Sequence, residues 1–146
     1  MPRLQARERG DTRAQIFEDR VTSFAEFDRR SNRVAQALLA ADVAPQARIG
    51  FLGKNSDRYF ELLFGVAKVN AVLVGVNWRL AVPEIEYILK DAGATVVFVG
   101  AEYYEVMAEV AARCPSITRI VAMDGEHAQW PAFDAWRDAH SATDPD

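Results

Sequence analysis

The sequence predicts an α/β fold in which a mostly parallel sheet is flanked by helices, with a short β-hairpin near the N-terminus. Three observations lead to this prediction. Strand-like apolar runs alternate with amphipathic helical segments from residue 47 to residue 140. The connections between them are short, as in sheets built from strand-helix-strand units. Residues 71–76 form an apolar run without alternation, which is typical of a strand covered on both faces.

The first third of the chain supplies a polar arm, a hairpin and a helix. Residues 1–13 are polar and rich in arginine, and we expect a poorly ordered arm there. Residues 14–19 alternate apolar and polar side chains, and residues 20–22 return as the second hairpin strand. Ser23 and Glu26 have the spacing of a capping box, which begins a helix that runs to about Ala41.

The rest of the chain alternates strands and helices. A strand at 47–53 precedes a helix at 55–69 whose side chains are apolar around most of its circumference, so we expect it to be packed on several sides. After the strand at 71–76, Pro83 opens a helix and Gly93 ends it. The remaining elements are strands at 94–99 and 119–123 and helices at 103–113 and 131–140. The α/β domain is therefore predicted over residues 14–140, followed by a linker-like tail at 141–146.

The composition indicates a folded globular domain and excludes several functional classes. Of 146 residues, 50% are hydrophobic and 26% are charged, a balance that excludes a disordered chain. The longest apolar run is far shorter than the roughly 20 residues that cross a bilayer. No leader segment opens the chain, so we expect a cytoplasmic protein. One cysteine, Cys114, and two histidines provide neither a disulfide framework nor a metal cluster.

The net charge of −4 is unevenly distributed. Residues 1–33 contain eight arginines and six acidic residues, whereas acidic residues prevail in the remainder. A basic arm could make a peripheral contact with an anionic membrane surface. Because acids are interleaved with the arginines, a solvated helix face is the better explanation. No interleaving of aromatic and basic residues indicates a nucleic-acid partner.

The loop between the first parallel strand and its helix is one candidate for anion binding. Gly50 to Ser56 occupies the place where a phosphate loop would lie. However, two residues rather than four separate Gly50 from Gly53, and Asn55 rather than Ser or Thr follows Lys54. An ordinary strand-to-helix turn is the favoured interpretation, with Gly53 relieving backbone crowding.

A second candidate is the segment Asn77-Trp78-Arg79, because ligands bind at the carboxyl ends of strands in α/β proteins. The favoured interpretation is again structural: Asn77 would satisfy backbone groups and Arg79 would pair with a nearby acid. Glu84 and Glu86 are two residues apart on a helix and do not share a face, so they form no acid-base pair.

Several motifs follow one another in the order found in the acyl-adenylate-forming enzymes of the AMP-binding superfamily. Residues 16–27, Ile-Phe-Glu-Asp-Arg-Val-Thr-Ser-Phe-Ala-Glu-Phe, resemble the strand-turn and helix start of that family. Residues 68–80 resemble its pattern Lys-x-Gly-Ala-x-x-x-Pro-x-Asn-x-Arg-Leu, with Asn70 in the place of glycine and Gly75 in the place of proline. The resemblance covers residues 12–146 and is strongest to fatty-acyl-CoA synthetases (long-chain-fatty-acid–CoA ligases).

This resemblance implies that the parent protein is an ATP-dependent acyl-CoA synthetase, an acid–thiol ligase. It would activate a fatty or other apolar carboxylic acid through acyl-AMP, with ATP, Mg and CoA as cofactors. The phosphate loop and the catalytic lysine of the family would follow residue 146. No catalytic, cofactor-binding or metal-binding residue is therefore assigned. We expect the chain alone to be inactive, to bind none of these cofactors, and to have the remainder of its parent chain as its partner.

Two other interpretations stay open. The chain could be a self-contained flavodoxin-like binding or dimerisation module, with a ligand at the carboxyl edge of its sheet. It could also be one chain of a split enzyme that docks with a separate catalytic polypeptide. A large exposed apolar patch would favour a synthetase segment or a split enzyme over a self-contained module. Acyl-chain specificity and oligomeric state are not predicted.

Overall fold

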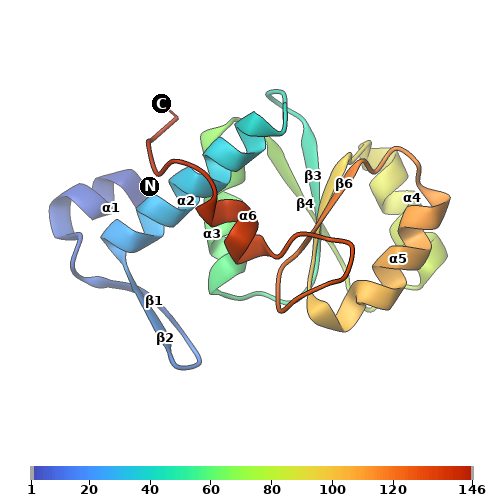
Figure 1. Ribbon diagram of the computed structural model, residues 1–146, viewed down its shortest axis with the longest axis horizontal. Coiled ribbons are helices and arrows are strands. Elements are labelled where there is room, and N and C mark those ends of the chain that lie inside the picture. The colour runs from blue at the N-terminus through green and yellow to red at the C-terminus, as the bar shows by residue number, and fades with distance from the viewer. Residues whose placement is uncertain (1, 146) are drawn as a thin grey trace. The chain divides into compact units, whose positions relative to one another are not determined.

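The computed structural model describes residues 2–145, which form two compact units (Figure 1). The first unit contains the residues up to Ala44, the segment Asn55–Asn70 and the residues from Arg137 onward. The second unit contains Pro45–Lys54 and Ala71–Trp136. Within residues 2–145, no helix has the length and apolar character needed to cross a membrane.

The first unit consists of helices and a hairpin. Its elements are α1 (Pro2–Arg9), β1 (Arg13–Phe17), β2 (Arg20–Ser23), α2 (Phe24–Ala40) and α3 (Asp57–Lys68). The strands β1 and β2 pair antiparallel, which confirms the predicted hairpin. The Ser23 hydroxyl accepts the N–H of Glu26 at 3.2 Å, so the predicted cap of α2 is also confirmed. The Glu26 carboxylate binds Arg29 and Arg30 on the next turn.

The expectation of a poorly ordered arm is wrong for residues 2–9, which form α1. The turn after α1 is fixed to the start of α2, because the N–H of Ala25 donates to the carbonyl of Gly10 at 2.9 Å. The Arg9 guanidinium also lies over the Phe24 ring, 5.2 Å from its centroid. The apolar residues of α1 do not recur at helical spacing, so the sequence alone does not predict this helix. Its contacts with α2 hold it in place.

The last described residues lie along α2, within the same unit. The side chain of Asn32 donates to the carbonyl of Ala142 at 3.1 Å, and that of Gln36 donates to the carbonyl of Thr143 at 2.9 Å. Arg33 donates to the carbonyl of Asp138 at 2.8 Å. The segment from residue 138 to residue 143 is thus held by side chains on successive turns of one helix.

The second unit is a parallel sheet of four strands in the order β4-β3-β5-β6, with α4 and α5 beside it (Figure 1). The strands are β3 (Arg48–Leu52), β4 (Val72–Val76), β5 (Val96–Val99) and β6 (Arg119–Ala122). The helical elements are α4 (Val82–Ala92), the short 3₁₀ helix η1 (Ala101–Tyr103), α5 (Tyr104–Arg113) and the start of α6 (Phe133–Asp138). Parallel strands, flanking helices and an N-terminal hairpin confirm the predicted fold class.

The predicted ends of α4, at Pro83 and Gly93, are confirmed. Gly93 adopts the left-handed conformation at φ 65° and closes the helix, as predicted from its position. At the other end, the Glu84 carboxylate accepts the N–H of Ala81 at 2.8 Å, and Pro83 lies in the first turn. The buried side of α4, with Ile85 and Leu89, packs into a core that contains residues of β3, β5 and α5.

One expectation about burial is wrong. β4 is an edge strand rather than a strand covered on both faces: Val72 is 39% exposed, and a side chain at Gly75 would meet nothing within 4 Å. An apolar run shows that a strand is suited to burial, but not where it lies in the order of the sheet. The helix α3, by contrast, is packed on several sides as expected: among its residues only Phe60, which is 41% exposed, and Ala67 are exposed, and even the charged Glu61 is fully buried.

Candidate functional site

The carboxyl ends of three neighbouring parallel strands bring the two sequence candidates together in the second unit. The segment after β3 carries Lys54, the segment after β4 carries Trp78 and Arg79, and the segment after β5 carries Glu102 and Tyr103. Because β3 lies between β4 and β5, all three segments emerge at the same edge of the sheet. This is the edge at which open α/β sheets bind their ligands.

The indole of Trp78 is the centre of this cluster. The Lys54 amine lies 5.4 Å from the centroid of the indole, and the Arg79 guanidinium carbon lies 4.9 Å from it. Both distances fall within the roughly 6 Å of a cation–π contact. The ring of Tyr103 lies 5.9 Å from the indole at an interplanar angle of 34°. Trp78 stays 37% exposed, so part of this surface is open to a ligand.

The two cations differ in their acidic partners. The Lys54 amine binds the Glu102 carboxylate at 2.7 Å, which raises the pKa of Lys54 and lowers that of Glu102. Arg79 was expected to pair with an acid, but its guanidinium has no carboxylate partner among residues 2–145 and lies over Trp78 instead. The positive charge of Arg79 is therefore available to an anion.

The turns beneath the cluster are ordinary ones, as predicted. The side-chain oxygen of Asn77 accepts the N–H of Arg79 at 3.1 Å, which fixes the turn after β4. After β3, a Cβ on Gly53 would lie 3.1 Å from the ring of Phe51 and 3.3 Å from the N of Gly100, so a side chain here would be tightly crowded. This close approach explains the glycine at position 53 of the turn.

The cluster has the chemistry of an anion-binding surface. An indole that carries two cations, of which Arg79 has no carboxylate partner among residues 2–145, suits an anionic group. Among the residues that the structure describes, the titratable groups of the cluster are Lys54, Arg79, Glu102 and Tyr103. The part of the chain that the structure describes contains no group of three His, Cys, Asp or Glu side chains able to hold a metal ion.

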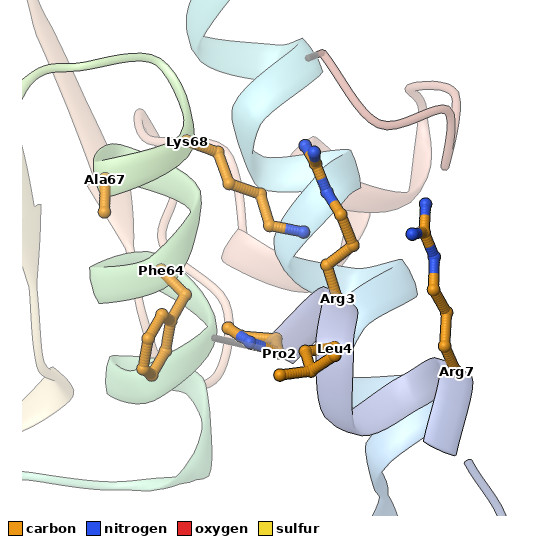
Figure 2. A pocket seen from close by; sticks show the side chains of 7 residues that line it. All are labelled: Pro2, Arg3, Leu4, Arg7, Phe64, Ala67 and Lys68. Atoms are coloured by element: carbon orange, nitrogen blue, oxygen red, sulfur yellow. The ribbon is translucent and has the colours of Figure 1, made fainter. Parts of the chain in front are cut away.

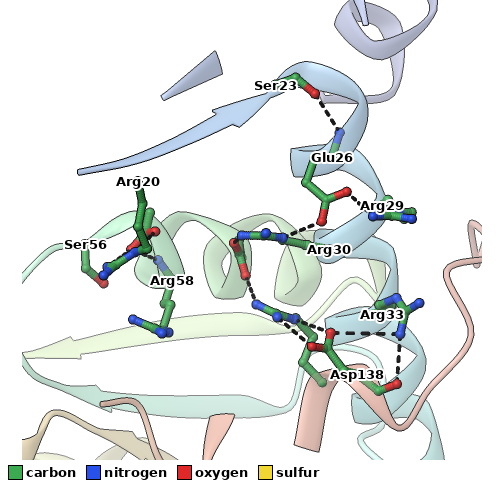
Figure 3. A network of polar contacts seen from close by, with 12 residues as sticks. Arg20, Ser23, Glu26, Arg29, Arg30, Arg33, Ser56, Arg58 and Asp138 are labelled. Carbon is green, nitrogen blue, oxygen red and sulfur yellow. Dashed lines mark hydrogen bonds and ion pairs between the residues drawn. The ribbon is translucent and has the colours of Figure 1, made fainter. Parts of the chain in front are cut away.

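Sequence reasoning missed a buried ionic network in the first unit (Figure 3). Glu61 on α3 is fully buried and accepts hydrogen bonds from Arg137 at 2.6 Å and from Arg30 at 3.1 Å. Burial raises the pKa of Glu61, although the charges of Arg137 and Arg30 oppose this shift. Arg137 is itself 5% exposed and also binds Asp138 through two nitrogens. The sequence signal that could have indicated this network is Glu61 itself, an acidic residue in a helix whose side chains are apolar around most of its circumference.

A second ion pair in the same unit joins the hairpin to α3. The Arg20 guanidinium binds both carboxylate oxygens of Asp57, each at 2.8 Å. Asp57 is 4% exposed and follows Ser56, whose hydroxyl accepts the N–H of Tyr59 and caps α3. These two networks fix the helices and the hairpin within the first unit.

Comparison with known proteins gives the family of the chain. A family model described as AMP-binding enzyme matches residues 3–146. A fatty acid–[acyl-carrier-protein] ligase of Streptomyces coeruleorubidus is 43% identical over 134 residues, which cover 92% of this chain and 24% of that protein. A long-chain-fatty-acid–CoA ligase of Mycobacterium tuberculosis is 38% identical over 100 residues, which cover 68% of this chain and 19% of that ligase.

Solved structures agree with the sequence relatives. An anthranilate CoA ligase in complex with anthranoyl-AMP superposes with a TM-score of 0.92 at 27% identity, over 97% of this chain and 28% of the ligase. The N-terminal domain of FACL13 from Mycobacterium tuberculosis superposes with a TM-score of 0.89 at 28% identity, over 99% of this chain and 36% of that domain. The chain thus spans about a quarter of the length of the curated relatives that it matches. Since the family model covers nearly all its residues, the chain belongs to the AMP-binding enzyme family.

Proposed function

We propose that the chain is the N-terminal part of an acyl-adenylate-forming acid–thiol ligase that activates a fatty or other apolar carboxylic acid. The observation that supports this most is the family match over residues 3–146, together with relatives that are ligases of about four times its length. In the proposed reaction the carboxylate attacks the α-phosphate of ATP and releases pyrophosphate. A thiol then displaces AMP from the acyl-AMP and forms the thioester.

The role proposed for this chain is that of a scaffold with one anion-binding surface. Mg-bound ATP needs carboxylate ligands and a phosphate-binding loop. The strand-to-helix turn at Gly53 does not supply that loop. The catalytic groups are therefore proposed to come from the remainder of the parent polypeptide, and the 146-residue chain alone is proposed to be inactive.

Exposed apolar side chains support a larger parent protein over a self-contained module. Ile16 and Val21 face each other across the hairpin and are 60% and 57% exposed. Phe60 lines a shallow pocket together with Ile16. On β4, in the other unit, Val72 is also exposed. In the proposed ligase these surfaces are covered by the rest of the polypeptide.

The thiol acceptor is proposed to be CoA. The CoA ligases among the relatives support this choice, whereas the relative from Streptomyces is by its name a fatty acid–[acyl-carrier-protein] ligase. The first step, adenylation, is the same for either acceptor. A thioesterification assay with CoA and with a phosphopantetheinylated carrier protein, supplied separately, identifies the acceptor.

The deciding experiment begins with the mass of the native protein, detected with an antibody against this chain. We expect a polypeptide several times heavier than 16.3 kDa. That protein should catalyse ATP–pyrophosphate exchange that depends on added acid, tested with octanoate, dodecanoate, hexadecanoate and benzoate. The 146-residue chain, assayed in parallel, should show no exchange. A native mass near 16.3 kDa would overturn the proposal in favour of a self-contained module or a split enzyme.

A further inference from the structure

We propose that a cavity between α1 and α3 is a binding site for a single-chain fatty carboxylate, separate from the cluster around Trp78. The cavity has a volume of about 360 Å³ and lies entirely within the first unit. Figure 2 shows side chains of the two helices facing each other across it. Its volume is at the lower end of the range of small-molecule sites, about 300–1,000 Å³.

One part of the lining is apolar. Phe64 and Ala67 on α3 and Leu4 on α1 contribute to it. The Phe64 ring is held by an edge-to-face contact with Phe27, with the ring centroids 5.4 Å apart. Leu4 is 52% exposed, so an apolar chain in the cavity would remove part of that surface from water. A hydrocarbon chain therefore has a wall to pack against.

The other part of the lining is cationic, and it consists of Arg3, Arg7 and Lys68. The Lys68 amine donates to the carboxylate of Asp28 at 2.6 Å and to the side-chain oxygen of Asn32. An ammonium group has three donors, so one donor of Lys68 has no acceptor within residues 2–145. The Lys68 side chain is 11% exposed, which gives that donor a largely dehydrated setting.

Charge at the cavity favours an anion. Asp28 balances Lys68, and Arg3 forms an ion pair with Asp144. The Arg7 side chain makes no hydrogen bond or ion pair inside the described part of the chain. The positive charge of Arg7 is thus left over in a lining that also contains the apolar wall and the unused donor of Lys68. A carboxylate group supplies a negative charge for Arg7 and an acceptor for Lys68, and a single hydrocarbon tail packs against the apolar wall.

The test measures binding of radiolabelled decanoate to the native protein by equilibrium dialysis. Arg7→Gln should weaken binding at this site about tenfold, the loss expected for one charge-assisted hydrogen bond. Ala67→Phe fills the cavity from an exposed position on α3 and should remove one equivalent of bound decanoate. Arg9→Gln is the matched control on α1, because Arg9 contacts Gln5 and Phe24 instead of the cavity, and binding should be unchanged.

Other outcomes would overturn the proposal. Equal binding by the native protein, Arg7→Gln and Ala67→Phe would place decanoate elsewhere. Inorganic phosphate that competes as well as decanoate would mean that the apolar wall plays no part. Cosedimentation with phosphatidylglycerol vesicles that Arg7→Gln abolishes and Ala67→Phe leaves intact would identify a membrane-surface contact in place of a cavity. The thermal unfolding of each variant is measured as well. An unchanged unfolding temperature confirms that a loss of decanoate binding is not due to a loss of folding.

Discussion

Gly65 on α3 lies directly against Val34 on α2: a Cβ built on the glycine would fall 2.4 Å from Val34 Cγ1 and 3.1 Å from the carbonyl oxygen of Ser31. Real side chains do not approach so closely, so the two helix backbones are in contact here only because residue 65 has no side chain. This contact explains a glycine in the middle of a helix, where alanine would otherwise be preferred by about 1 kcal/mol.

Gly65→Ala should therefore destabilise the protein by about 1–3 kcal/mol, since overpacking outweighs the gain in helix propensity. The free energy of unfolding in urea measures the effect. Gly75→Ala is the control, because nothing lies within 4 Å of a Cβ at that position on β4. It should leave stability unchanged or slightly raised. Equal stability of Gly65→Ala and the unmodified protein would show that α2 and α3 separate at little cost.

The cluster around Trp78 should bind pyrophosphate, the anion that the proposed reaction releases. Arg79→Gln should weaken binding about three- to tenfold, because it removes the cation that has no acidic partner among residues 2–145. Titration of the native protein, followed by tryptophan fluorescence, measures this affinity. Arg119→Gln, at the start of β6, is the control for net charge and should have no effect. Equal affinity of Arg79→Gln and the native protein would assign Arg79 a structural role only.

Asp57 and Arg20 should make stability depend on pH in the acid range. Burial alone would raise the pKa of Asp57, but the hydrogen bonds and charge of Arg20 outweigh burial and hold that pKa below its ordinary value. The folded pKa is thus lower than the unfolded pKa, near 3.9. The pair contributes its full stability above about pH 4 and loses it as the pH falls through the folded pKa.

Asp57→Asn should accordingly cost about 1–3 kcal/mol at neutral pH and flatten the acid side of the stability curve. Urea unfolding at several pH values between about 2 and 7 tests both effects. Glu18→Gln serves as a control, because Glu18 lies 3.9 Å from Arg20 and is mostly exposed. A curve for Asp57→Asn that runs parallel to that of the unmodified protein would contradict the prediction.

The buried pair of Glu61 and Arg137 should be strongly coupled. Arg137→Met leaves the Glu61 charge with only Arg30 and should cost about 3–5 kcal/mol. Replacing both residues, as Glu61→Leu with Arg137→Met, should cost less than the sum of the two single changes because no charge is then stranded. A double-mutant cycle in urea measures the coupling. Additive losses would mean that water reaches Glu61 in the folded protein.

Much of the fold could be predicted because its signals are local. Ser23, Pro83 and Gly93 marked helix ends through backbone chemistry that depends on a few adjacent residues. Asn70 is a further case: it adopts a left-handed conformation at φ 54°, which explains why the related pattern has glycine there. Signals of this kind do not require knowledge of the partner across the core.

What could not be predicted depends on distant partners. Lys54, Trp78 and Tyr103 looked unrelated in sequence, and only the central place of β3 in the strand order brings them together. The burial of Glu61 depends on Arg137, which is 76 residues away. The helix α1 lacks an apolar period and forms through contacts with α2. The order of the strands, the partners of buried charges and the packing of a polar helix all depend on residues that are far apart in the sequence.

The attachment of residues 138–143 to α2 also has a consequence for proteolysis. A protease must draw an extended, unpaired stretch of backbone into its active site, and the carbonyls of Asp138, Ala142 and Thr143 are engaged by Arg33, Asn32 and Gln36. Cleavage after Arg137 by trypsin should therefore be slow under native conditions. Replacing Asn32 and Gln36 by alanine should release the segment and speed cleavage, which mass spectrometry of a timed digest would detect.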